Sequence, residues 1–233
     1  MQTIMTLSIV IPTYNEEQNI GPLITFLKQY GSNAVADIII ADAGSEDNTV
    51  NIVKENGATL SASLKRCRAS QMNNGAGLAK GDILYFIHAD TLPPKTFVKD
   101  IFKSIKDGFD LGRYTSKFKS DKLMLRFNEW VAKLDLFMCM GGDQTLFIKK
   151  ELFKKLGGFN EEMLIMEEYE FCRRARAQGM YKIMNGETLI SARKYHKNSW
   201  LQVQLANAKI LMMYKKGVDQ NQLVEKYKKM LQF

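Results

Sequence analysis

Short apolar runs alternate with segments of helical spacing through the first half of the chain, and this alternation constrains the fold most. The apolar runs, which we interpret as buried strands, span residues 7–11, 37–41 and 83–87, and the weakly alternating residues 58–64 are a candidate for a further strand. The segments between them, which we interpret as helices, span residues 19–30, 47–56 and 68–79. Strands alternating with helices at this interval predict βαβ units. The sequence therefore predicts an α/β fold with a mostly parallel central sheet flanked by helices.

The second half of the chain is less regular. Three helical segments and two short strands are predicted there, in chain order at residues 97–105, 122–137, 144–148, 167–178 and 181–184. Residues 200–233 predict two C-terminal helices, broken near Gly217. No linker, repeat or low-complexity tract interrupts the sequence, so we expect residues 1–233 to form one domain.

The composition bounds the partners of the chain. Its 233 residues carry a formal net charge of +8, which suits an anionic partner. Basic residues are scattered and form no aromatic–basic platform, so we expect no nucleic acid partner. The three cysteines, Cys67, Cys139 and Cys172, lack metal-ligand spacing and are expected to be reduced thiols. Neither a signal peptide nor a run of about 18 apolar residues is present. We expect a cytoplasmic protein, free or attached peripherally to the inner face of the membrane.

Polar side chains follow three of the predicted strands. Residues 12–16, 42–47 and 88–90 carry them, and each stretch alone is compatible with a helix cap or a turn. Ligands of open parallel sheets bind beyond the carboxyl ends of the strands. Three polar strand ends at one edge therefore predict a ligand site.

The sequence lacks the glycine-rich loops that bind phosphates in dinucleotide-binding and P-loop proteins. A diphosphate would then need a metal or basic side chains. His88 and Asp90 offer an imidazole and a carboxylate at one strand end. Carboxylates suit Mg²⁺ or Mn²⁺ that also bridges phosphate oxygens, and imidazole suits Mn²⁺ better.

Several motifs in order resemble those of inverting glycosyltransferases of family two, which have the A-type fold. The matching segments are residues 8–16, 39–49, 79–90, 156–161 and 167–174. Residues 68–76, 88–91 and 142–144 look closest to a short soluble bacterial subgroup that is loosely linked to arsenosugar biosynthesis. The resemblance implies a nucleotide-binding half at about residues 1–91, an acceptor and catalytic half at about 92–199, and C-terminal helices at 200–233.

The resemblance also implies an activity and the residues that support it. A sugar would pass with inversion from a nucleoside-diphosphate sugar, with UDP expected, to an acceptor hydroxyl, aided by a divalent metal, Mn²⁺ or Mg²⁺. Pro12, Tyr14 and Glu16 would line the nucleoside pocket, and Asp42 would bind the base. Arg66 or Arg68 would face the diphosphate.

The metal and catalytic residues depart from the family pattern at two positions. Asp90 would bind the metal, but His88 stands where the family has an aspartate. Glu168 stands where the family has the catalytic aspartate, and we predict that it is the general base, with Glu167 in a supporting role. We expect Glu170 to be only an acid at a helix start.

Four further features have two or more interpretations. Gly142, Asp143 and Gln144 either approach the acceptor or form a tight turn. Trp130 either stacks on a sugar or belongs to the core. His196 either joins the metal site or lies in a solvated basic loop. Residues 200–214 pack on the sheet, which we prefer, or they lie on a membrane surface or form a dimer face.

Two other functions share this fold class. A sugar-phosphate nucleotidyltransferase would show a glycine-rich basic loop after the first strand, and the sequence has none there. A non-catalytic protein that binds sugar nucleotides would keep Asp42 without needing acids at Glu167. For any of these, the expected partner is a nucleotide sugar, and a transferase would also need an acceptor that is a small molecule, a glycan or lipid-linked.

Overall fold

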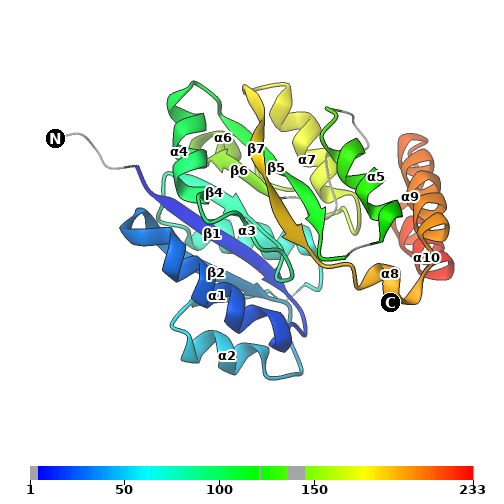
Figure 1. The fold of residues 1–233 in the computed structure, drawn as a ribbon, viewed down its shortest axis with the longest axis horizontal. Coiled ribbons are helices and arrows are strands. Elements are labelled where there is room, and N and C mark those ends of the chain that lie inside the picture. The colour runs from blue at the N-terminus through cyan, green and yellow to red at the C-terminus, as the bar shows by residue number, and fades with distance from the viewer. Residues whose placement is uncertain (1–4, 64, 121, 136–144, 233) are drawn as a thin grey trace.

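The computed structural model describes residues 5–63, 65–120, 122–135 and 145–232. A central sheet runs through this part of the chain with the strand order β3-β2-β1-β4-β6-β5-β7 (Figure 1). The strands are β1 (Leu7–Thr13), β2 (Val35–Asp42), β3 (Thr59–Ala62), β4 (Ile83–Phe86), β5 (Leu111–Phe118), β6 (Leu146–Lys149) and β7 (Tyr181–Ile190). β6 pairs antiparallel with β4 and β5, and the other pairs are parallel. The mostly parallel sheet predicted from the sequence is confirmed.

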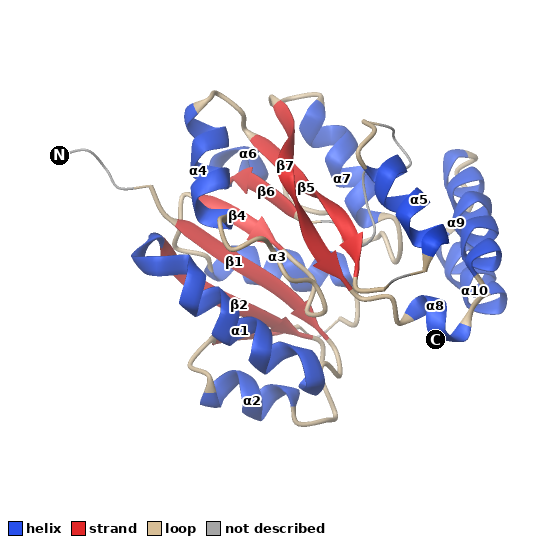
Figure 2. Cartoon of the chain, in the orientation of Figure 1, coloured by secondary structure: helices blue, strands red, loops and turns tan. Residues whose placement is uncertain are grey.

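Helices cover both faces of the sheet (Figure 2). They are α1 (Glu17–Gly31), α2 (Thr49–Glu55), α3 (Arg68–Leu78), α4 (Phe97–Lys106), α5 (Leu123–Ala132), α6 (Lys150–Lys155), α7 (Glu167–Arg176), α8 (Lys194–Lys197), α9 (Trp200–Lys215) and α10 (Gln220–Met230). A short 3₁₀ turn at Ser32–Ala34 joins α1 to β2. The two predicted C-terminal helices are present, and the glycine between them, Gly217, has a positive φ of 71°.

Successive side chains of the central strands enter two separate cores. Ile9 and Ile11 pack with α1, α2 and α4 on one face, whereas Val10 packs with α3, α6 and α7 on the other. This alternation follows from the pleat of a strand, which turns neighbouring side chains to opposite faces. Because both faces are covered, the strands are apolar at nearly every position, as the sequence indicated.

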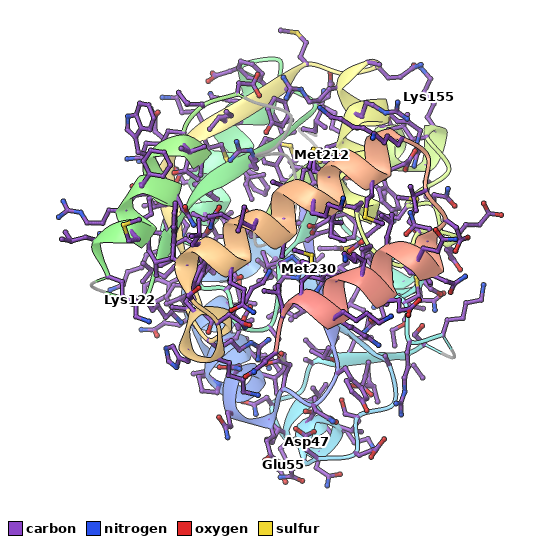
Figure 3. The ribbon with its side chains drawn as sticks, turned by 90° about the vertical axis from the view of Figure 1, so that its right-hand side faces the viewer. Asp47, Glu55, Lys122, Lys155, Met212 and Met230 are labelled. Atoms are coloured by element: carbon purple, nitrogen blue, oxygen red, sulfur yellow. The ribbon has the colours of Figure 1, made fainter. Side chains whose placement is uncertain are left out.

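A third apolar cluster lies at the end of the molecule that carries α5, α9 and α10 (Figure 3). Its buried members come from α5, from the segment around α8, from α9 and from the C-terminal residues: Leu125, Ala192, Tyr195, Val203, Ala206 and Leu231. Packing on the sheet was our preferred interpretation for residues 200–214. One side of α9 does pack on the protein, but in this third cluster and not in either core on the faces of the sheet.

The sequence did not predict β5. Its residues read LGRYTSKF, without a clear apolar run, yet the first six are buried. Arg113 is 2% exposed because its guanidinium donates to the Tyr181 hydroxyl at 2.7 Å and to the Ala132 carbonyl at 3.0 Å. An arginine in a sequence normally predicts an exposed position, but hydrogen-bond partners from distant segments allow Arg113 to be buried.

Candidate functional site

The carboxyl ends of β1, β2 and β4 lie at one edge of the sheet, where the polar strand ends were predicted to meet. Thr13 at the end of β1 stands in register with Asp42 at the end of β2. Asp42 is 4% exposed and accepts four hydrogen bonds. One oxygen accepts from the backbone amides of Gly44 and Ser45 at 2.9 and 2.8 Å, and the other from the hydroxyls of Thr13 and Ser45. These bonds use the acceptor capacity of a carboxylate, so Asp42 shapes the loop after β2.

Gln71 on α3 forms hydrogen bonds to the ends of both β1 and β2. It is 6% exposed, and its amide nitrogen donates to the carbonyls of Thr13 at 2.8 Å and Ala41 at 2.7 Å. Sequence reasoning missed this residue. The sequence does not single it out, because Asn73 and Asn74 on the same helix are amides as well.

Tyr14 and Arg66 form an exposed stack beside this loop. The Arg66 guanidinium lies 4.7 Å from the centre of the Tyr14 ring and 3.0 Å from Glu46. The Tyr14 hydroxyl donates to the same Glu46 carboxylate at 3.4 Å. Pro12, by contrast, is buried within β1. The structure therefore brings two of the predicted nucleotide-binding residues to the surface and keeps one in the sheet.

Arg193 links two of the predicted site carboxylates. Its guanidinium lies 2.7 Å from Glu16 and 3.3 Å from Asp90, although residue 193 is far from both in the sequence. Glu16 is held further by the Asn19 amide, which donates to it at 2.7 Å. The sequence analysis missed Arg193, whose only signal was its place in a basic segment after the last strand.

The predicted metal ligands offer few protein donors. Among the residues the structure describes, no group of three His, Cys, Asp or Glu side chains is arranged to hold an ion. Asp90 is partly exposed at the sheet edge and supplies one carboxylate. Mg²⁺ is commonly bound by one or two carboxylates together with substrate phosphates and waters. The residues present thus fit a cation that arrives with a diphosphate, not one held by protein alone.

His88 turns from the sheet edge toward α7. Its Nε2 lies 3.1 Å from the Glu168 carboxylate, and both side chains are nearly buried. The two residues are separated by 80 positions, and each was predicted for the site independently, one as metal ligand and one as base. The structure brings them together as a pair.

Glu167 precedes Glu168 and is 4% exposed. Burial raises the pKa of the Glu167 carboxyl; the neighbouring Arg68 opposes this shift and the Glu168 charge adds to it. The Arg68 guanidinium lies 3.5 Å from Glu167, which joins the start of α3 to the start of α7. One predicted diphosphate residue and both predicted catalytic acids therefore share one ionisable cluster with His88.

Glu170 proves to be more than an acid at a helix start. It pairs with Arg174, which also donates to the carbonyls of Leu156 at 2.7 Å and Gly158 at 2.8 Å. Gly157 and Gly158 both have positive φ, which glycine adopts without strain. The Gly-Gly-Phe segment is thereby fixed against α7. Glu170 thus lies in the first turn of α7, as expected, and it also pairs with Arg174 one turn further along the same helix.

Other predicted residues lie apart from this cluster or outside the described residues. Trp130 is 59% exposed on α5, with its ring 6.1 Å from that of Phe127, so the interpretation as core is wrong. His196 is exposed on α8, three residues after Arg193. Gly142, Asp143 and Gln144 lie outside the described residues.

A profile of the family described as Glycosyl transferase family 2 matches residues 8–156, which carry the Asp42 loop and the His88–Asp90 loop. The chain belongs to this family. The resemblance recognised in the sequence is confirmed.

Two curated relatives are glycosyltransferases by name. A Haemophilus influenzae protein named an uncharacterized glycosyltransferase is 24% identical over 180 residues, which cover 71% of this chain and 60% of that protein. The dolichol-phosphate mannosyltransferase of Pyrococcus furiosus is 24% identical over 124 residues, which cover 51% of this chain and 35% of that protein. The chain thus spans less than two thirds of either relative's length.

Solved structures share the fold of this family 2 member. S. aureus TarS 1–349 in complex with UDP-GlcNAc has a TM-score of 0.63 at 19% identity, covering 81% of this chain and 59% of that one. Glucosyl-3-phosphoglycerate synthase from Mycobacterium tuberculosis, in complex with Mn²⁺, UDP and glucosyl-3-phosphoglycerate, has a TM-score of 0.59 at 17% identity, covering 92% and 81%. The predicted A-type fold is confirmed.

Two further expectations concern thiols and membrane spans. Cys67 and Cys172 carry free, buried thiols, and burial raises the pKa of Cys172 to about 12; Cys139 lies outside the described residues. Within the described part of the chain, no helix combines the length and apolar character needed to cross a bilayer.

Proposed function

We propose that this family 2 member is an inverting glycosyltransferase that moves a sugar from a UDP-sugar to an acceptor hydroxyl. The observation that carries the proposal is the His88–Glu168 pair at 3.1 Å, which holds a carboxylate at the carboxyl edge of the sheet. Inverting transfer needs a base that removes the acceptor proton and a cationic environment for the departing diphosphate. The cluster of His88, Glu168, Glu167 and Arg68 contains groups for both tasks.

Glu168 is the general base in this proposal. It takes the proton from the acceptor hydroxyl while that oxygen bonds to the anomeric carbon and the bond from this carbon to UDP breaks. His88 orients the carboxylate through its ring nitrogen. Glu167 is nearly buried and lies 3.5 Å from the Arg68 guanidinium, so it serves as the anchor of Arg68 and not as the base.

UDP is the proposed nucleotide. Two structures of the same fold are complexes with UDP or a UDP-sugar, which supports the choice. Tyr14 and Arg66 offer a flat surface beside the loop after β2, where the base of the nucleotide would lie. Arg68 faces the diphosphate, and Asp42 acts on the base directly only if it gives up one of its four loop hydrogen bonds.

Asp90 is the proposed protein ligand of a divalent metal, Mn²⁺ or Mg²⁺, with His88 or His196 as further candidates. Such a metal would neutralise charge on the diphosphate. Asp90 forms an ion pair with Arg193 in this structure, so a metal ion at Asp90 would compete with the Arg193 guanidinium for the same carboxylate. We therefore infer that the Arg193 guanidinium withdraws from Asp90 when the metal and the nucleotide bind, while it keeps its closer partner Glu16.

Turnover of matched variants tests the base. Glu168→Gln keeps the shape of the side chain but cannot take a proton, so turnover should fall by about 10²–10⁴-fold with UDP affinity unchanged. Glu167→Gln is the adjacent control and should lose less. Near-wild-type turnover of Glu168→Gln, with loss only in Glu167→Gln, would move the base by one residue. Asp143 becomes the candidate if both variants stay active.

Calorimetry of UDP binding with and without Mn²⁺ tests the metal. Wild-type protein should bind UDP more tightly with Mn²⁺, and Asp90→Asn should not. Asp107→Asn is the control, because Asp107 is also an exposed aspartate paired with a cation, Lys182, but lies away from the sheet edge. Equal tightening in Asp90→Asn would place the metal elsewhere.

Several finer points stay predictions. The acceptor is a small molecule, a glycan or a lipid-linked molecule, and the roles of Trp130, Gly142, Asp143 and Gln144 depend on which. Cytoplasmic location, membrane attachment and a homodimer also stay predictions. No observation favours the nucleotidyltransferase or the non-catalytic binding protein over glycosyl transfer.

A further inference from the structure

α5 turns its apolar side toward solvent. Leu123, Phe127 and Trp130 are 75%, 54% and 59% exposed, and Leu134 just beyond the helix is 37% exposed. The spacing of Leu123, Phe127 and Trp130, four and three residues, puts these three on one face of α5. Leu125, which is buried in the third cluster, lies about half a turn away from them. The solvent-facing side of α5 is therefore apolar, with few polar groups, whereas a surface helix usually turns its polar side outward.

α9 repeats the arrangement with the same spacing. Leu201, Leu205 and Met212 are 59%, 58% and 55% exposed, and with the exposed Ala208 they form one face. The opposite side of the helix packs on the protein through its buried residues, Val203, Ala206 and Ile210. Two helices in contact thus both present apolar side chains outward.

The two outward faces meet where α5 contacts the start of α9. The Phe127 ring lies 6.3 Å from the Trp200 ring at the start of α9, and the Trp200 indole donates to Asn128 on α5 at 3.1 Å. We call the exposed apolar residues of α5 and α9 the α5–α9 face. Figure 3 views this end of the molecule, with α9 and α10 toward the viewer and α5 at the left edge near Lys122. Contiguous exposed apolar surface of this kind marks an interaction site.

The charge around the α5–α9 face is positive. Residues 188–218 contain no Asp or Glu and six Lys or Arg. Arg126 on α5 and Lys209 on α9 are exposed. The acids near α5 are engaged, since Glu129 accepts from the Phe118 amide at 2.8 Å and Asp135 pairs with Arg176 at 2.6 Å. The partner of this face must therefore combine negative charge with an apolar interior.

We propose that the α5–α9 face binds the surface of an anionic lipid bilayer. Its leucine, methionine and aromatic side chains enter the boundary between headgroups and acyl chains, and the surrounding Lys and Arg side chains contact lipid phosphates. A second copy of the chain fits less well, because a two-fold interface would set the same cationic rim against itself. The proposal is independent of the proposed transferase activity.

Co-sedimentation of the whole chain with vesicles tests the proposal. The protein should sediment with vesicles of equal parts phosphatidylcholine and phosphatidylglycerol, and much less with phosphatidylcholine alone. The triple variant Leu123→Ser/Leu201→Ser/Leu205→Ser should lose more than about tenfold in affinity through the lost apolar insertion. Arg126→Gln/Lys209→Gln should lose about 25-fold at low salt, since each basic residue near the surface contributes about fivefold.

Matched substitutions elsewhere serve as controls. Leu78→Ser removes a leucine that is 49% exposed on α3, and Lys54→Gln removes an exposed lysine from α2. Both should bind vesicles as wild type does, and all variants should keep the wild-type melting temperature. Failure to sediment with either kind of vesicle overturns the proposal. It is also overturned by binding that no α5–α9 substitution weakens, or by a wild-type dimer in sedimentation velocity that the triple variant abolishes.

Discussion

Replacing Gln71 by Met should destabilise the protein and loosen the nucleotide loops together. The side chains have nearly the same shape, so the change removes hydrogen bonding and leaves packing almost unaltered. Two donated bonds are lost, to the carbonyls of Thr13 at 2.8 Å and Ala41 at 2.7 Å. Thr13 O keeps a second donor, the Ala43 amide at 3.0 Å.

The magnitude follows from these two bonds. At about 1 kcal/mol for each, the free energy of unfolding should fall by about 2 kcal/mol. For a chain of this size each kcal/mol lowers the melting temperature by about 2–4 °C, so a fall of about 4–8 °C is expected. Thermal unfolding followed by circular dichroism measures this shift, and urea denaturation checks the free energy independently.

Gln222→Met is the matched control, because Gln222 is exposed on α10 and its substitution should change stability by less than about 0.5 kcal/mol. UDP affinity measured on the same variants separates stability from function. Gln71 spans the two strand ends that lead into the Tyr14 and Asp42 loops, so Gln71→Met should also weaken UDP binding. An unchanged melting temperature in Gln71→Met would refute the argument, because it would mean that both carbonyls find other donors at no cost.

Two further predictions concern α7. Arg174→Met removes the donors to the Leu156 and Gly158 carbonyls and leaves Glu170 without this partner. The melting temperature of this variant should fall well below that of Arg173→Met, which replaces the exposed neighbouring arginine. Equal melting temperatures of the two variants would contradict the role given to Arg174. Burial raises the pKa of the Glu167 carboxyl in the folded protein above its ordinary value of 4.5. As the pH rises above 4.5, the unfolded chain loses this proton more readily than the folded protein does, so the native state becomes less stable. Glu167→Gln should therefore raise the melting temperature at neutral pH, by an amount that shrinks as the pH is lowered toward the ordinary Glu pKa; a gain independent of pH would contradict this.

The local sequence was sufficient for the alternation of strands and helices. β1, β2 and β4 are apolar at nearly every position because both faces of the sheet are covered, and that makes them visible without any partner. Helix ends were predicted to within a few residues where a glycine follows, as at Gly57. β5 was not predicted, because the burial of its first residues depends on groups that are distant in the sequence, such as Tyr181 and Ala132, which accept hydrogen bonds from Arg113.

For the candidate site, the sequence by itself determined which segments bear polar groups at the strand ends, and family motifs supplied their expected roles. Only the tertiary structure decided the pairings: His88 with Glu168, Glu167 with Arg68, and Arg193 with both Glu16 and Asp90. These pairs join residues 80 or more positions apart in the sequence, and no spacing rule relates any of them. The sequence also could not predict that α5 and α9 turn apolar sides to the solvent. Helical periodicity shows that apolar residues share a face, but not whether that face meets the core or the solvent.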